Sequence, residues 1–145
     1  MKIALGADER LPVIETIWKY LVEHHHQVTW FGPAANQSTP WPQVARHVAE
    51  AVTNGEAQEG ILLCWTGTGV SIAANKVPGI RAALCTDAET ARGARLWNNA
   101  NVLCLSMRLT TDALAKEILE AWFGTSYQPN PSDDACLQMI QELDQ

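Results

Sequence analysis

The sequence has little positive charge, no long apolar run and no closely spaced cysteines. Its 145 residues include 10 lysines and arginines against 16 aspartates and glutamates, which gives a net charge of -6. This balance argues against a surface for nucleic acid or anionic membranes and is compatible with only a small, local anion site. No apolar stretch reaches the about 20 residues of a membrane-spanning helix, and no basic and apolar leader opens the chain. We therefore expect a cytoplasmic protein with neither nucleic-acid nor membrane partners.

The cysteines are widely spaced and sit mostly in or beside apolar runs. Cys64, Cys85, Cys104 and Cys136 form neither a CxxC pair nor a zinc-binding pattern, so we interpret them as reduced thiols. The three histidines at 24–26 are adjacent in the chain, so their side chains point in different directions, and we interpret them as a solvated loop. We expect neither a metal nor a cofactor.

Short apolar runs alternate with segments of helical period. The runs are Lys2–Gly6, a weaker one at Gln27–Phe31, then Gly60–Cys64, Arg81–Cys85 and Asn101–Leu105. Strands that are apolar on both faces and separated by helices are typical of a parallel sheet covered on both sides. The sequence therefore predicts an α/β fold, a three-layer αβα sandwich with a Rossmann-like five-stranded parallel sheet. The length fits one domain over residues 1–145.

The helices have recognisable starts. Proline marks the first two, near Pro12 and Pro42, and Thr86 with Glu89 predicts a capping box for a helix that reaches about Trp97. The turn-rich residues 128–133 precede a final helix at about 132–145. Because the apolar positions at 114–122 and 136–143 exceed what one small sheet is expected to cover, we predict that this final helix packs on a partner subunit.

In such sheets the ligand lies beyond the carboxyl ends of the strands, where the strand order reverses. The segments expected to meet there are residues 6–9, 64–71, 86–87 and 106–108. Within them, Gly67 and Gly69 permit backbone angles closed to other residues and a close approach to a ligand. The amides of Gly69, Val70 and Ser71 are expected to open a helix and form an anion site.

A cysteine, Cys64, stands directly before this glycine loop, and a helix N-terminus lowers the pKa of a nearby thiol. A buried structural cysteine beside a tight turn is the alternative. Three functional hypotheses compete. Dinucleotide binding is weakened because Ile72 occupies the third glycine position, and a phosphocysteine loop is weakened because no arginine follows at the required spacing. Proton transfer, with Cys64 as base and the loop amides holding an oxyanion, is the third.

Three stretches resemble the type-B ribose-5-phosphate isomerases and the related galactose-6-phosphate isomerase subunits. They are MKIALGAD at residues 1–8, GILLCWTGTGVSIAANKVPGIRAALCTD at 60–87, and NNANVLCLSMR at 98–108. The resemblance implies an aldose–ketose isomerase that works without a metal through a cis-enediolate, with Cys64 moving a proton between C1 and C2. It also implies a site completed by a neighbouring subunit, in a homodimer or a tetramer built from dimers.

The resemblance implies a role for individual residues as well. Asp8 and Asn98 match positions that bind sugar hydroxyls, Thr66 matches a threonine that assists ring opening, and Arg108 matches an arginine that reaches the phosphate. The amides between Gly67 and Ser71 would hold the enediolate oxygen, a contribution of about 3 kcal/mol per donor in comparable sites.

The departures from the family bear on the substrate. Glu9 replaces a histidine and can accept hydrogen bonds from sugar hydroxyls. Trp97 replaces the ring-opening histidine, and we expect it to narrow the pocket, to stack on a sugar face or to pack at an interface. No basic residue follows Lys116, so the family's terminal arginines are missing. We therefore expect a substrate other than ribose 5-phosphate, either a tetrose phosphate held by Arg108 or an unphosphorylated or modified sugar. The alternative is a sugar-binding or regulatory relative with impaired turnover.

Overall fold

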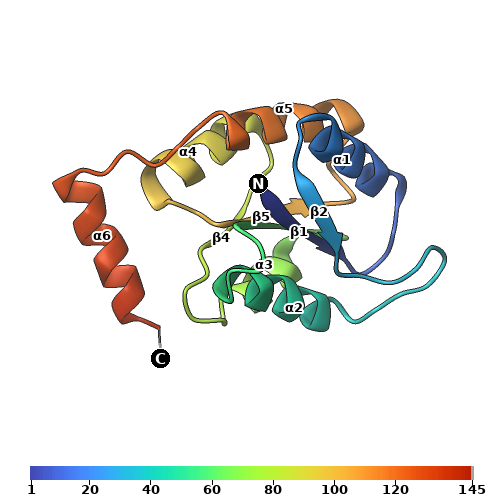
Figure 1. Ribbon diagram of the computed structural model, residues 1–145, viewed down its shortest axis with the longest axis horizontal. Helices are drawn as coiled ribbons and strands as arrows, with labels where there is room; N and C mark the ends of the chain where they lie inside the picture. The colour runs from blue at the N-terminus through green and yellow to red at the C-terminus, as the bar shows by residue number, and fades with distance from the viewer. Residues whose placement is uncertain (145) are drawn as a thin grey trace.

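The fold is a parallel sheet between two layers of helices. The computed structural model describes residues 1–144. All strand pairs are parallel, in the order β2-β1-β3-β5-β4 (Figure 1). The strands are β1 (Lys2–Ala7), β2 (Gln27–Trp30), β3 (Glu59–Cys64), β4 (Ala82–Leu84) and β5 (Val102–Ser106). The predicted fold class is confirmed, and each predicted apolar run overlaps one strand to within a residue or two at either end.

Helices cover both faces of the sheet. Those described are α1 (Pro12–Glu23), α2 (Trp41–Thr53), α3 (Thr68–Ala74), α4 (Ala88–Asn98), α5 (Asp112–Phe123) and α6 (Pro131–Glu142). Helices α1, α4 and α5 pack on one face of the sheet, while α2 and α3 pack on the other (Figure 1). None of the helices between residues 1 and 144 has the length and apolar character that crossing a membrane requires.

Two glycines let α2 approach the centre of the sheet closely. A Cβ on Gly6 of β1 would lie 2.7 Å from Val44 Cγ1, and one on Gly60 of β3 would lie 2.7 Å from Val48 Cγ1. Neither strand position therefore accommodates a side chain. This close packing fixes the start of α2 beside the carboxyl ends of β1 and β3.

The start of α4 differs from the prediction. The N-cap is Asp87, whose carboxylate accepts a 2.7 Å hydrogen bond from Thr90 N. The predicted capping box of Thr86 with Glu89 is wrong, because the extended cap residue lies one position later, and Glu89 instead pairs with Arg92. The helix also continues one residue further than predicted, to Asn98.

The last two helices behave differently from each other. Ile118, Leu119 and Trp122 of α5 are fully buried against the sheet, so the expectation that α5 carries excess apolar surface is wrong. Helix α6 has no buried residue, and it stands away from the sheet at one end of the molecule (Figure 1). Met139 and Leu143 are 64% and 76% exposed. Packing of α6 on a second subunit stays a prediction.

Candidate functional site

The carboxyl ends of the three central strands bring the predicted site segments together. Strands β1, β3 and β5 are neighbours, and Cys64 at the end of β3 is in register with Ser106 at the end of β5. Two backbone bonds extend this pairing into the loops: Met107 N donates to Cys64 O at 2.9 Å, and Arg108 N donates to Trp65 O at 3.0 Å. The loop that carries Arg108 is thereby fixed against the loop that follows Cys64.

Ser106 holds these two loops from within. Its hydroxyl donates to Trp65 O at 2.8 Å and accepts from Leu109 N at 3.1 Å, and the residue is buried. The sequence placed Ser106 in the site region and gave it no role. A small hydroxyl residue at the end of a central strand, where two loops must be joined, was the available signal.

The glycine loop turns sharply after β3. Gly67 has φ 78°, the left-handed conformation that favours glycine, and a Cβ there would lie 2.9 Å from the carbonyl of Leu105. Helix α3 begins at Thr68, and the amides of Thr68, Gly69 and Val70 have no hydrogen-bond acceptor within residues 1–144. These amides point to an oxyanion or anion ligand.

One predicted donor is wrong. The amide of Ser71 donates to Gly67 O at 3.3 Å, so it is occupied by the first turn of the helix rather than open to a ligand. The amides available to a ligand are therefore those of Thr68, Gly69 and Val70 rather than Gly69, Val70 and Ser71. The hydroxyls of Thr66 and Thr68 are hydrogen bonded to each other at 2.7 Å across the mouth of the loop.

Cys64 combines burial with a position at the loop. Its side chain is 5% exposed and belongs to the apolar cluster under α2 and α3, together with Val70 and Cys104. Burial raises the pKa of Cys85 to about 12, and Asp87 adds to the effect. Burial also raises the pKa of Cys104 above its ordinary range. The thiols of Cys85 and Cys104 therefore stay protonated near neutral pH.

Asp8 follows β1 and faces the same region. Its Oδ1 atom is buried and has no hydrogen-bond partner in the part of the chain that the structure describes. Desolvation raises the pKa of Asp8 above its ordinary value, and the charge of Glu9 raises it further, while backbone hydrogen bonds oppose the shift. A buried oxygen without a partner is costly, so Asp8 is suited to bind a hydroxyl of a ligand.

Trp41 forms a wall beside the glycine loop. A Cβ on Gly69 would lie 3.1–3.2 Å from three atoms of the Trp41 indole, which is 41% exposed. The segment before Trp41 is tied to β1 because Thr39 N donates to Asp8 O at 3.0 Å. Trp41 was not among the predicted site residues, since its contact with Gly69 joins two helices that are remote in sequence. Trp65, at the rim, is 56% exposed.

Trp97 and Asn98 lie near the amino ends of the strands, at the edge of the sheet opposite to Cys64. Helix α4 runs back from the carboxyl end of β4 and ends at Asn98, before β5 begins at Val102. Since β5 rises about 13 Å at about 3.3 Å per residue, this end of α4 is remote from Cys64 of the same chain. Trp97 is 60% exposed, and Asn98 lines a cavity of about 210 Å³ with Arg81 and Ile140.

The two remaining predicted residues are exposed near the carboxyl edge. Glu9 lines a polar groove of about 660 Å³ with Arg10 and residues 36–38. Arg108 is exposed, and among the described residues its hydrogen bond is made by its backbone amide, so its guanidinium is available to a ligand. Within residues 1–144 no group of three or more His, Cys, Asp or Glu side chains is arranged to hold a metal ion.

Comparison with known proteins identifies the family. Residues 3–140 match the model of the family described as Ribose/Galactose Isomerase. The chain belongs to this family. It is 41% identical over 128 residues to ribose-5-phosphate isomerase B of Escherichia coli, which covers 88% of this chain and 86% of that protein. It is 42% identical over 130 residues to D-erythrulose-4-phosphate isomerase of Pectobacterium atrosepticum, covering 88% and 86%.

A solved structure agrees with the whole architecture. Ribose-5-phosphate isomerase B of Clostridium thermocellum superposes with a TM-score of 0.94 at 40% identity, covering 99% of this chain and 97% of that one. The resemblance noted in the sequence is therefore confirmed, and so is the enzyme class, a sugar isomerase. The roles of individual residues stay predictions.

Proposed function

We propose that this protein interconverts an aldose and a ketose of a short-chain sugar phosphate, with Cys64 as the base that moves a proton between C1 and C2. One arrangement carries the proposal. A cysteine at the end of the central strand precedes three amides that have no acceptor within residues 1–144. Beside them, Asp8 presents a buried carboxylate oxygen that has no partner among the same residues. A base, an oxyanion site and a hydroxyl ligand are the groups that an enediolate mechanism needs.

The proton balance follows from these groups. Thiolate of Cys64 removes the proton from the carbon next to the carbonyl, and the carbonyl becomes an enediolate oxygen. Amides of Thr68, Gly69 and Val70 stabilise the negative charge on that oxygen, at about 3 kcal/mol per donor. The thiol then returns the proton to the neighbouring carbon, while a proton moves between the two oxygens. We assign to the hydroxyl of Thr66, at the mouth of the loop, the role of assisting this proton transfer between the oxygens.

The complete site, in this proposal, requires two subunits. Trp97 and Asn98 lie at the opposite edge of the sheet from Cys64, so they reach a reaction centre only when a second copy of the chain presents that edge. A homodimer, or a tetramer built from dimers, satisfies this requirement. Helix α6, with its exposed apolar side chains, is the element we expect at the subunit contact. We assign the protein to the cytoplasm, where sugar phosphates are metabolised.

The proposed length of the substrate rests on two groups that this chain lacks, the ring-opening histidine and the terminal basic residues. Trp97 cannot transfer a proton to open a ring, and a four-carbon sugar phosphorylated at O4 cannot close a furanose ring. No lysine or arginine follows Lys116, so we assign the phosphate to Arg108. Glu9 and Asp8 then accept hydrogen bonds from the sugar hydroxyls. Relatives of both substrate classes are about equally similar, at 42% identity for the D-erythrulose-4-phosphate isomerase and 41% for ribose-5-phosphate isomerase B. The proposal of a tetrose phosphate therefore rests on Trp97 and on the missing basic residues.

A second candidate is a sugar-binding relative that has lost turnover. The exposed indole of Trp97 favours it, because an indole stacks on a sugar face and carries no transferable acid proton near neutral pH. A substrate panel distinguishes the two functions. We expect the highest kcat/KM for erythrose 4-phosphate or erythrulose 4-phosphate among tetrose, pentose and hexose phosphates and the free pentoses. Thermal stabilisation by these sugars without interconversion of any would support the second candidate.

A further inference from the structure

Helix α4 ends in a residue with a left-handed backbone conformation. Asn99, directly after the helix, has φ 45° and ψ 43°, the left-handed region that glycine usually occupies at a helix end. Asparagine is one of the few residues with a side chain that adopt this region readily, so Asn99 suits the turn. Trp97 and Asn98 are the last two residues of α4, so groups that hold this turn also hold the end of the helix that carries them.

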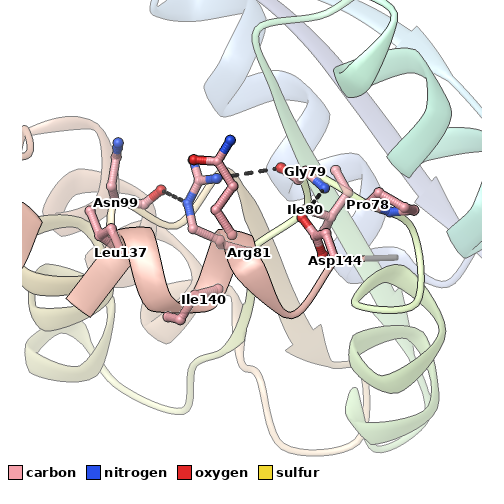
Figure 2. A pocket seen from close by; sticks show the side chains of 9 residues that line it. Pro78, Gly79, Ile80, Arg81, Asn99, Leu137, Ile140 and Asp144 are labelled. Carbon is pink, nitrogen blue, oxygen red and sulfur yellow. Dashed lines mark hydrogen bonds between the residues drawn. The ribbon is translucent and has the colours of Figure 1, made fainter. Parts of the chain in front are cut away.

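Arg81 contacts this turn directly. Its Nε donates to Asn99 O at 2.8 Å, and its Nη1 donates to Gly79 O at 3.4 Å. Figure 2 shows the guanidinium between these two carbonyl oxygens. The backbone of Arg81 also fixes the start of the next strand, since its amide donates to Asn101 Oδ1 at 2.8 Å and its carbonyl accepts from Asn101 N at 3.0 Å.

The loop on the other side of Arg81 is fixed as well. Gly79 N donates to Asp144 Oδ2 at 2.8 Å (Figure 2), and Asn101 Nδ2 donates to Gly79 O at 3.0 Å. Arg81 and Asp144 both line the groove of about 620 Å³ between this loop and α6. Burial lowers the pKa of Arg81, and the nearby charge of Arg95 lowers it further. The carboxylate of Asp144 opposes this shift.

A second arginine secures the same turn from inside the protein. Arg95 Nη1 donates to Ala100 O, and Arg95 Nη2 lies 3.4 Å from Glu59 Oε2. Glu59 in turn accepts a 2.8 Å bond from the buried Trp122 indole. Two cations therefore hold consecutive carbonyls at the C-terminus of α4, where the helix dipole favours positive charge. Arg95 is paired with Glu59, whereas Arg81 lies on the side of the turn that lines the groove.

We propose that Arg81 is a positioning residue for the active site of the neighbouring subunit, acting through the Asn99 carbonyl on Asn98 and Trp97. The inference rests on the proposed function, in which these two residues complete the partner's site. It assigns Arg81 no contact with substrate. It predicts that loss of the guanidinium impairs the site that contains the partner's thiol and leaves the site around the same chain's own Cys64 intact.

The first test compares Arg81→Met with wild type. Methionine keeps an apolar stem and removes every donor, and Arg46→Gln, an exposed change on α2, serves as the control. We expect kcat/KM of the Arg81→Met dimer to fall about 10-fold to 100-fold, because a displacement of about 1 Å can cost about 100-fold. Arg81→Lys keeps the charge but loses the fork, so it should be intermediate, and it replaces the methionine variant if that variant does not fold. Wild-type activity in both would overturn the proposal.

The second test uses mixed dimers. Cys64→Ala and Arg81→Met chains carrying different tags are co-expressed, and the mixed dimer is isolated through both tags. One of its two sites combines an intact Cys64 with an α4 end held by an intact Arg81, so we expect about half of the wild-type activity. A mixed dimer no more active than the Arg81→Met homodimer would show that Arg81 serves its own chain's site and would overturn the proposal.

The third measurement does not depend on turnover. Backbone hydrogen–deuterium exchange should be faster in Arg81→Met over residues 97–101 and unchanged over residues 64–71. Unchanged exchange at both segments would contradict a positioning role for Arg81 whatever the activity. If wild-type protein isomerises no sugar while the exchange difference is present, the proposed function fails and the structural basis of the Arg81 assignment stands.

Discussion

Replacing Gly67 with alanine tests how tightly the glycine loop after β3 is packed. In the left-handed region, alanine costs about 1–2 kcal/mol relative to glycine. At Gly67 the added Cβ would also lie 2.6 Å from Leu84 Cδ1 and 2.9 Å from the carbonyl carbon and oxygen of Leu105. The leucine side chain can move, but the backbone of a central strand cannot, and such overpacking costs about 1–3 kcal/mol more. We expect the free energy of unfolding to fall by about 2–5 kcal/mol in total.

Gly55 provides a matched control for this change. It has φ 79°, nearly the same as the 78° of Gly67, and a Cβ there would meet nothing within 4 Å. Gly55→Ala therefore measures the backbone cost alone, about 1–2 kcal/mol. Urea unfolding of the two variants gives the difference between their free energies of unfolding. Equal losses in Gly67→Ala and Gly55→Ala would refute the reasoning that the loop is packed against β5.

Two further predictions concern the residues beside this loop. Asp8→Asn should raise the melting temperature at neutral pH, because the folded-state pKa of Asp8 is raised and its ionised form destabilises the fold. The gain should disappear as the pH falls from that raised value toward the ordinary pKa of aspartate, and a gain independent of pH would contradict this cause. Ser106→Ala removes a donor to Trp65 O and an acceptor for Leu109 N. We expect the free energy of unfolding to fall by about 1–3 kcal/mol and kcat to fall in the same preparation. Unchanged urea unfolding would refute the role of Ser106 in holding the two loops together.

The strands were predictable because burial on both sides of a parallel sheet leaves a continuous apolar run. Strand β3 is buried along its whole length, and it begins one residue before the predicted run and ends at the same residue, Cys64. Helix starts were harder to predict, because the cap depends on which residue has extended backbone angles. Asp87 and Thr86 are adjacent candidates for the α4 cap, and only the structure distinguishes them.

The parts of the site that follow one strand were predictable, and the parts built by packing were not. Asp8, Cys64 and Gly67 follow directly from strand ends. The contact of Trp41 with Gly69 depends on how closely α2 approaches the sheet, which no local pattern encodes. The position of Asn98 follows from topology, since a helix between two parallel strands must return to the amino edge. That argument requires the sheet order as well as the motif.

The most direct test of the central claim is exchange of the C2 hydrogen of the substrate with solvent. In D2O, wild-type protein should introduce deuterium at C2 of erythrose 4-phosphate. Proton NMR measures this as loss of the signal of the C2 hydrogen. Cys64→Ala should retain the fold and bind the sugar but lose this exchange, while Cys136→Ala, which changes an exposed thiol on α6, should exchange like wild type. Exchange that continues at the wild-type rate in Cys64→Ala would contradict the assignment of Cys64 as the base.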